Sequence, residues 1–264
     1  MSIEFKEAYL KCALGIKQDF PELNSLAATI LIGRSYLHAL THQSIIKGYP
    51  LPTTGPAIVT SNHRASGDSF KMCIAGLESH RLIRAVCKKG LMVRGFSESP
   101  KYLCSIRDNT PSAQFNPLEA FVLKGEGAKP VNRERPGRNF LRDTDEVLNL
   151  NGILGIYLQP HRYKDCFLRN LQLGTAVIAL RHPDIPIYVM VSSGHPYGRD
   201  KLTILKPFTC NQKVVEFRRK ISAGELTIMM ADMNAKNAHP VVQEDWRTRR
   251  PQELARLSHS TKPA

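Results

Sequence analysis

The chain has 264 residues, of which 42% are hydrophobic and 23% charged, a balance typical of globular proteins that argues against a largely disordered chain. Its 37 Lys and Arg residues outnumber 23 Asp and Glu residues, and the resulting formal net charge of +14 favours anionic partners: nucleic acid, an anionic membrane surface, an acidic carrier protein or a coenzyme. Six cysteines without a CxxC pair argue against a zinc site and against a secreted disulfide scaffold.

The amino-terminal region is predicted to be helical. Residues 3–47 show helical periodicity in two pieces, with a break near Pro21. Apolar residues from Ile30 to Ile46 form a stripe with Lys, Arg and His beside it. The stripe fits either a helix pair packed on its own domain or a basic amphipathic surface in a membrane interface. We therefore predict a helical extension over residues 1–50, with membrane association as one of its two open roles.

No segment is predicted to cross a membrane. The most apolar run, Leu26–Gly33, is far shorter than the roughly 20 residues of a membrane-spanning helix. The first residues carry acids where a signal peptide has a basic region. We expect a protein that is soluble or peripheral to a membrane.

A Pro- and Gly-rich loop at 48–56 is followed by short apolar strands that alternate with helices. Strands are predicted at residues 57–61, 82–86, 153–158 and 185–191, and helices at residues 70–77, 117–123, 139–149, 173–181 and 211–223. This alternation predicts one α/β domain over residues 51–250, with a largely parallel sheet flanked by helices. Residues 251–264 are predicted to be a polar tail.

The segment Ser61–Ser69 lies where a buried strand gives way to a helix. His63 and Asp68 are five residues apart and would point about 140° apart in a continuous helix. They can meet only if the chain turns between them, and Ser66-Gly67 can supply that turn. Asp68 would then accept the Nδ1 proton of His63 and leave Nε2 as a general base toward a hydroxyl group. The other interpretation is a His that caps a loop and an Asp that caps a helix.

Four ordered stretches resemble one enzyme family. Asn62-His-Arg-Ala-Ser-Gly-Asp68, which follows an apolar strand, resembles the His-x4-Asp block of the glycerol-3-phosphate and 1-acylglycerol-3-phosphate acyltransferases. Gly127-Ala-Lys-Pro-Val-Asn-Arg133 resembles the second block of that family, in which a Gly and an Arg flank an apolar strand. Residues 174–179 and 185–191 are similar to its small-residue helix and its Pro-containing strand. The resemblance covers roughly residues 55–195.

The third block of the family departs from its usual sequence. It normally reads Pro-Glu-Gly-Thr-Arg, and the corresponding stretch here is Leu158-Gln-Pro-His-Arg162. The Arg is retained, whereas the Glu has become Gln159 and the Gly has become Pro160. In the family this block and the Arg of the second block help to hold the glycerol phosphate. The departure therefore leaves the acceptor substrate open.

The resemblance implies an acyltransferase-like sheet flanked by helices, preceded by the helical pair. It implies transfer of a fatty acyl group from acyl-coenzyme A or acyl carrier protein to a hydroxyl of a lysophospholipid or glycerol phosphate, with His63 and Asp68 as the catalytic pair. The substrate-binding residues that it implies are Asn62, Gly127, Arg133, Gln159 and Arg162. It implies no metal and no other cofactor, and a cytoplasmic protein bound to the anionic cytoplasmic face of the inner membrane.

Two alternatives keep the fold and change the function. One has a different acceptor, such as a lyso-ornithine-type lipid or a sugar; the other is a non-catalytic lipid-binding protein. A nucleic-acid partner is not expected, because the sequence has no recognition helix, RNP-type aromatic pair or zinc-finger spacing. Residues beyond about 194 give no functional prediction, and Trp246 fits either an interfacial anchor or a packed aromatic side chain.

Overall fold

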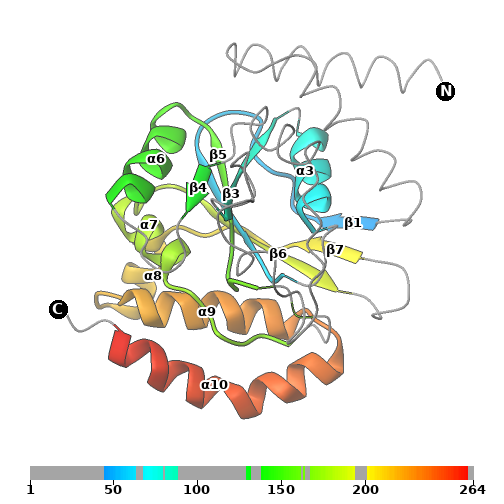
Figure 1. Ribbon diagram of the computed structural model, residues 1–264, viewed down its shortest axis with the longest axis vertical. Helices are drawn as coiled ribbons and strands as arrows, with labels where there is room; N and C mark the ends of the chain where they lie inside the picture. The colour runs from blue at the N-terminus through cyan, green and yellow to red at the C-terminus, as the bar shows by residue number, and fades with distance from the viewer. Residues whose placement is uncertain are drawn as a thin grey trace, which may run out of the picture.

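The protein is an α/β structure built on one mixed sheet (Figure 1). The computed structural model describes residues 45–63, 68–79, 81–88, 129–131, 138–161, 163, 167–193 and 201–260. The predicted α/β class with a sheet flanked by helices is confirmed. The predicted amino-terminal helical pair, apart from its last residues, and the helix at 117–123 lie outside the described residues.

The sheet has seven strands in the order β1-β7-β6-β2-β5-β3-β4. The strands are β1 (Ile45–Gly48), β2 (Ala57–Ser61), β3 (Ile83–Lys88), β4 (Lys129–Val131), β5 (Ile153–Tyr157), β6 (Ile187–Ser193) and β7 (Lys201–Ile204). All neighbouring strands run parallel except β6 and β7. Ser61 at the end of β2 is in register with Tyr157 of β5 and Met190 of β6. The carboxyl ends of three central strands therefore meet at one edge, where open α/β sheets commonly place their ligands.

Helices cover both faces of this sheet. They are α3 (Asp68–Glu78), α6 (Arg138–Asn149), α7 (Gly174–Arg181), α8 (Cys210–Phe217), α9 (Ala223–Lys236) and α10 (Pro240–Ser260). The helix α3 lies on one face, α6, α7 and α9 lie on the other, and α10 packs on the outer side of α9 (Figure 1). Among the helices in these described ranges, none is long and apolar enough to cross a membrane.

Strand β2 connects the two apolar clusters of the core. All five of its residues are buried. Ile58 belongs to the cluster that includes residues of α7 and α9, and Val59 belongs to the cluster that includes Met72 and Ala75 of α3. Successive side chains of a strand point to opposite faces, so a strand buried along its whole length fits the interior of a parallel sheet covered on both sides.

A glycine in β5 allows α3 to approach the sheet closely. A Cβ atom on Gly155 would lie 2.7 Å from Ile83 Cγ2 and 2.9 Å from Met72 Cε, both closer than side chains normally tolerate. Because α3 begins at Asp68, the packing of Met72 over Gly155 helps to fix where Asp68 stands. Asp68 is the first residue of α3, which begins two residues before the predicted helix at 70–77.

The end of the predicted helical extension is wrong. Ile45 and Ile46, which were predicted to be helical, lie in β1 and are in register with Lys201 and Leu202 of β7. β-Branched residues suit an extended backbone, and the pairing with β7 outweighs the local helical pattern. The predicted extension over residues 1–50 therefore includes a strand of the sheet, β1, which belongs to the α/β domain.

The predicted helix over residues 211–223 is two elements. The helix α8 ends at Phe217, because Arg218 adopts a left-handed backbone conformation with φ of 53°. A new helix then begins at Ser222, whose side chain and that of Glu225 form a capping box with each other's backbone N–H. This Ser-x-x-Glu signal is present in the sequence, and it marks the start of α9.

The predicted polar tail from residue 251 is also wrong over most of its length. The helix α10 continues to Ser260, and Leu257 is only 1% exposed. Leu257 packs beside Gly224 of α9 and joins the main core cluster. Trp246, on the same helix, is buried and donates a hydrogen bond from Nε1 to Asp232 Oδ1 over 2.8 Å. Trp246, for which an interfacial anchor and a packed aromatic side chain were both open, is therefore a packed aromatic side chain.

Replacement of Leu257 by alanine should lower the free energy of unfolding by about 2–5 kcal/mol, because it removes buried methyl groups and leaves a cavity against α9. Urea denaturation followed by circular dichroism measures this change. Leu150→Ala, at a leucine that is 61% exposed, is the matched control and should change it by less than about 0.5 kcal/mol. Equal, small effects of the two substitutions would contradict the packing of residues 251–260 against α9.

Candidate active site

The site begins at Asn62, directly after β2. Its side-chain amide pairs with the backbone of Ser192 in β6: Asn62 Nδ2 donates to the Ser192 carbonyl over 3.0 Å, and the Ser192 N–H donates to Asn62 Oδ1 over 2.9 Å. Asn62 is 2% exposed. The side chain thus replaces one rung of the β2–β6 ladder where β2 leaves the sheet. Both hydrogen-bonding groups of this predicted substrate-binding residue are engaged within the protein.

The predicted pair of His63 and Asp68 is formed. His63 Nδ1 lies 3.2 Å from Asp68 Oδ2. The side chain of His63 is 14% exposed, whereas that of Asp68 is 2% exposed. The intervening Ser66-Gly67 turn lies outside the described residues. A buried carboxylate on Nδ1 favours the tautomer in which Nδ1 carries the proton, and Nε2 is then the nitrogen with a lone pair for proton transfer.

A tyrosine that the sequence analysis did not single out holds the imidazole ring. The rings of His63 and Tyr157 are stacked, with their centroids 3.9 Å apart and their planes 10° apart. Tyr157 is the last residue of β5 and is in register with Ser61 of β2. The stacking fixes the plane of the imidazole while Asp68 fixes its rotation. The available signal was an aromatic residue at the end of a buried strand, directly before Leu158, the first residue of the third stretch.

Gln159, also predicted to bind substrate, bonds to two backbone groups. Its Oε1 accepts a hydrogen bond from the His63 N–H over 3.1 Å, and its Nε2 donates to the Phe167 carbonyl over 2.8 Å. The residue is 3% exposed. A glutamate, which stands at this position in the acyltransferase family that the sequence resembles, could accept the first bond but could not donate the second while ionised. The amide thus ties the backbone of His63 to the following loop.

Two further polar residues of the site were missed by the sequence analysis. Lys71 Nζ lies 3.2 Å from Asp68 Oδ1 and 3.2 Å from Ser192 Oγ, and the Ser192 hydroxyl lies 3.3 Å from the same carboxylate oxygen. The Lys71 side chain is 1% exposed. The only available signal was its position three residues after Asp68, which places both on one face of α3. The contact with Ser192 joins residues 121 positions apart and is tertiary.

The carboxy-terminal helix also contributes to the frame of the site. Glu253 of α10 is buried, and its two carboxylate oxygens accept hydrogen bonds from the N–H groups of Asn170 and Leu171 over 2.6 and 3.1 Å. The Asn170 amide donates to the Tyr163 hydroxyl over 2.8 Å, and the Tyr163 N–H donates to the His63 carbonyl over 2.9 Å. The loop that follows β5 is therefore held from α10 on one side and by His63 on the other.

The remaining predicted substrate-binding residues, Gly127, Arg133 and Arg162, lie outside the described residues. The apolar strand predicted between Gly127 and Arg133 is present as β4, next to β3. The structure thus brings together Asn62, His63, Asp68 and Gln159 at the carboxyl edge of the sheet. The resulting arrangement is a partly exposed imidazole, oriented by a buried carboxylate, which can accept a proton from a bound hydroxyl group.

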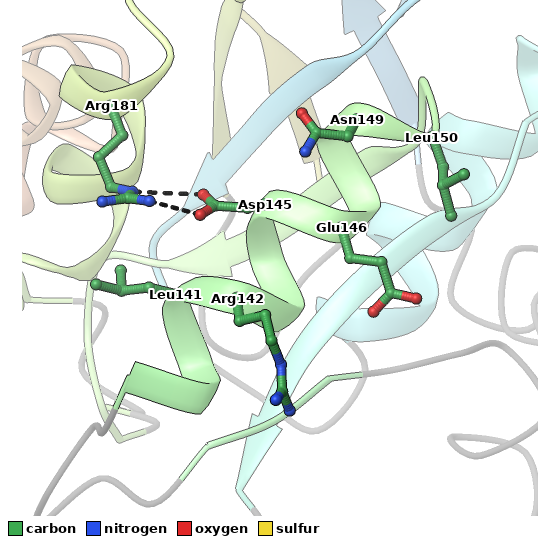
Figure 2. A pocket seen from close by; sticks show the side chains of 7 residues that line it. All are labelled: Leu141, Arg142, Asp145, Glu146, Asn149, Leu150 and Arg181. Atoms are coloured by element: carbon green, nitrogen blue, oxygen red, sulfur yellow. Dashed lines mark hydrogen bonds and ion pairs between the residues drawn. The ribbon is translucent and has the colours of Figure 1, made fainter.

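A surface hollow over α6 has a different character (Figure 2). Asp145 in its lining accepts hydrogen bonds from Arg181 over 2.6 Å and from His182 over 2.8 Å. The hydrogen bond from Arg181 holds the pKa of the Asp145 carboxyl below its ordinary value, which keeps this ion pair charged. None of the predicted site residues that the structure describes lines the hollow. We interpret Asp145 and Arg181 as a structural ion pair between α6 and α7.

The chain matches no known protein-family model, and it matches no curated protein. The functional inference therefore rests on the geometry of this site and on the spacing of the sequence motifs.

Replacement of Gln159 by glutamate should lower the free energy of unfolding at neutral pH by about 1–3 kcal/mol, because a carboxylate would face the Phe167 carbonyl without a proton to donate. The loss should shrink in acid, where a protonated carboxyl can donate that bond. Urea denaturation at both pH values measures it.

Gln212→Glu is the matched control for this substitution. Gln212 caps α8 by accepting the Thr209 N–H through Oε1 over 3.0 Å, a bond that a carboxylate makes equally well. This control should leave stability unchanged within about 0.5 kcal/mol. A Gln159→Glu protein as stable as the control at neutral pH would contradict the donor role of Gln159.

Proposed function

We propose that the protein is an O-acyltransferase that moves a fatty acyl group from acyl-coenzyme A or acyl carrier protein to a hydroxyl of a lysophospholipid or glycerol phosphate. The observation that carries the proposal is the contact of His63 Nδ1 with Asp68 Oδ2 over 3.2 Å, made by a partly exposed histidine at the carboxyl edge of the sheet. The resemblance of the surrounding sequence blocks to the acyltransferase family supports the same reaction.

In the proposed reaction His63 Nε2 removes the proton of the acceptor hydroxyl while the oxygen of that hydroxyl attacks the carbonyl carbon of the thioester. A new C–O bond forms, and the C–S bond then breaks. The departing thiolate takes the proton back from the imidazolium, so His63 returns to its starting state. Asp68 stabilises the transient imidazolium through Nδ1. The step needs no covalent intermediate on the protein.

The second candidate keeps this chemistry and changes the acceptor to a lyso-ornithine-type lipid or a sugar. Gln159 favours it, because both of its amide groups are engaged by backbone partners and neither is directed to a ligand. Arg133 and Arg162 are proposed to clamp a phosphate where the acceptor has one, since two guanidinium groups bind a phosphate by charge-assisted hydrogen bonds.

The proposed location is the cytoplasmic face of the inner membrane. The net charge of +14 supports attraction to anionic lipid and to the acidic donors, coenzyme A and acyl carrier protein. A non-catalytic lipid-binding role would not require a histidine and a buried carboxylate in hydrogen-bonding contact, so the site favours the enzyme.

The test is transfer of labelled acyl groups from acyl-coenzyme A and acyl carrier protein to a panel of lysophospholipids, glycerol 3-phosphate, lyso-ornithine lipid and sugars. His63→Ala should lower the rate of transfer by a factor of about 10² to 10³, because it removes the general base. The acceptor that wild-type protein uses best distinguishes the two candidate functions.

His182→Ala is the matched control, because His182 also contacts an aspartate, Asp145 Oδ1, over 2.8 Å. It removes another histidine–aspartate contact, one that lies between α6 and the end of α7. Activity should be retained in this variant. Absence of transfer to every acceptor by folded wild-type protein, or equal activity of His63→Ala, would overturn the proposal.

A further inference from the structure

We infer that Lys71 is a positioning residue of the site: it holds one oxygen of Asp68 and sets the pH range in which His63 acts as a base. The inference rests on the proposed function for its effect on catalysis. The structure supplies its geometric basis independently, in a lysine that is buried directly behind the catalytic carboxylate.

The two oxygens of Asp68 have different partners. Oδ2 faces His63 Nδ1 over 3.2 Å, whereas Oδ1 lies 3.2 Å from Lys71 Nζ and 3.3 Å from Ser192 Oγ. Lys71 also donates to Ser192 Oγ over 3.2 Å. The carboxylate is therefore held at both ends, and rotation of its plane would break contacts on the side away from His63.

Because both side chains are buried, each charge of this cation–anion contact depends strongly on the other. The side chains of Lys71 and Asp68 are 1% and 2% exposed. An ionised group placed so far from water requires a partner of opposite charge, because water no longer stabilises it. Lys71 comes from the same helix as Asp68, and Ser192 comes from β6. The contact thus ties α3 to the strand that also holds Asn62.

The charges around His63 decide how firmly it holds a proton. In the described part of the chain, Tyr157 of β5 is stacked on the imidazole, the Tyr163 N–H bonds to its carbonyl, Asp68 faces its Nδ1, and Lys71 stands behind Asp68. With Lys71 in place, a proton added to His63 meets a carboxylate whose charge is already balanced. The histidine can therefore give up that proton and serve as a base at lower pH.

Loss of the ammonium group reverses this effect. Without the Lys71 ammonium, the buried carboxylate loses part of its compensating charge and attracts a proton more strongly, either onto itself or onto His63, so the pair takes up its proton at higher pH. In a titration of activity the rise with pH would then move in the alkaline direction. Lost activity would be restored at high pH, which a general packing defect would not produce.

The experiment measures kcat/KM from about pH 5.5 to pH 9.5 for wild type and Lys71→Met, which keeps the volume and removes the charge. The alkaline shift should be at least about one pH unit, with about tenfold lower kcat/KM on the acidic limb and recovery at high pH. Lys213→Met removes the same charge from α8 and should leave the profile within about 0.3 pH unit.

A second variant covers the case in which Lys71→Met does not fold. Ser192→Ala removes the hydroxyl that contacts both Lys71 and Asp68, and it should shift the profile in the same direction by a smaller amount. A folded Lys71→Met protein with an unshifted profile, or with a loss that is equal at every pH, would overturn the inference. If Lys71→Met is unfolded, a Ser192→Ala protein whose pH profile of kcat/KM is unshifted would also overturn the inference.

A measurement that needs no substrate separates this inference from the proposed function. Histidine labelled with ¹³C and ¹⁵N gives an imidazole resonance for His63, assigned by its loss in His63→Ala. Its protonation midpoint should be higher in Lys71→Met than in wild type and unchanged in Lys213→Met. Wild-type protein without transferase activity would refute the acyltransferase, whereas an unchanged midpoint in folded Lys71→Met would refute the role of Lys71.

Discussion

The buried carboxylate of Asp68 is the constraint to which the surrounding structure conforms. An anion that is 2% exposed cannot rely on water, so the fold must deliver a cation, hydrogen-bond donors or both. The helix α3 supplies Lys71, β6 supplies the Ser192 hydroxyl, and the end of β2 supplies His63. The contacts that stabilise the buried carboxylate also hold it in place, and the carboxylate in turn orients the imidazole of His63.

Side-chain amides perform the second part of this positioning. Asn62 pairs with the backbone of β6 as a strand residue would, and Gln159 connects the His63 N–H to the Phe167 carbonyl. Both residues were predicted from the family resemblance to contact substrate. Their burial and their backbone partners show a structural contribution, because an amide can donate and accept at once. The stretch Leu158–Arg162 is thus compatible with an ordered site, although it lacks the carboxylate found in the corresponding block of the family it resembles.

Local patterns in the sequence predicted the parallel core and the contact between His63 and Asp68. The apolar run of β2 and the boundary between β2 and α3 were visible in the residues themselves, and they located His63 and Asp68 correctly. Predictions failed where long-range contacts outweighed local pattern. Ile45 and Ile46 join β7 in the sheet, and Leu257 is buried against α9, so a strand and a helix stand where a helix and a polar tail were predicted.

The α/β class, the passage from a buried strand to a helix near His63 and Asp68, and the short buried strands follow from local patterns, because these features depend on residues within a few positions of one another. Long-range packing is what brings Lys71 and Ser192 to the same carboxylate oxygen, stacks Tyr157 on the imidazole, and places Glu253 where it holds the loop beyond β5. These contacts join separate elements of the fold. Their partners are chosen by strand order and helix packing, which no local spacing in the chain encodes.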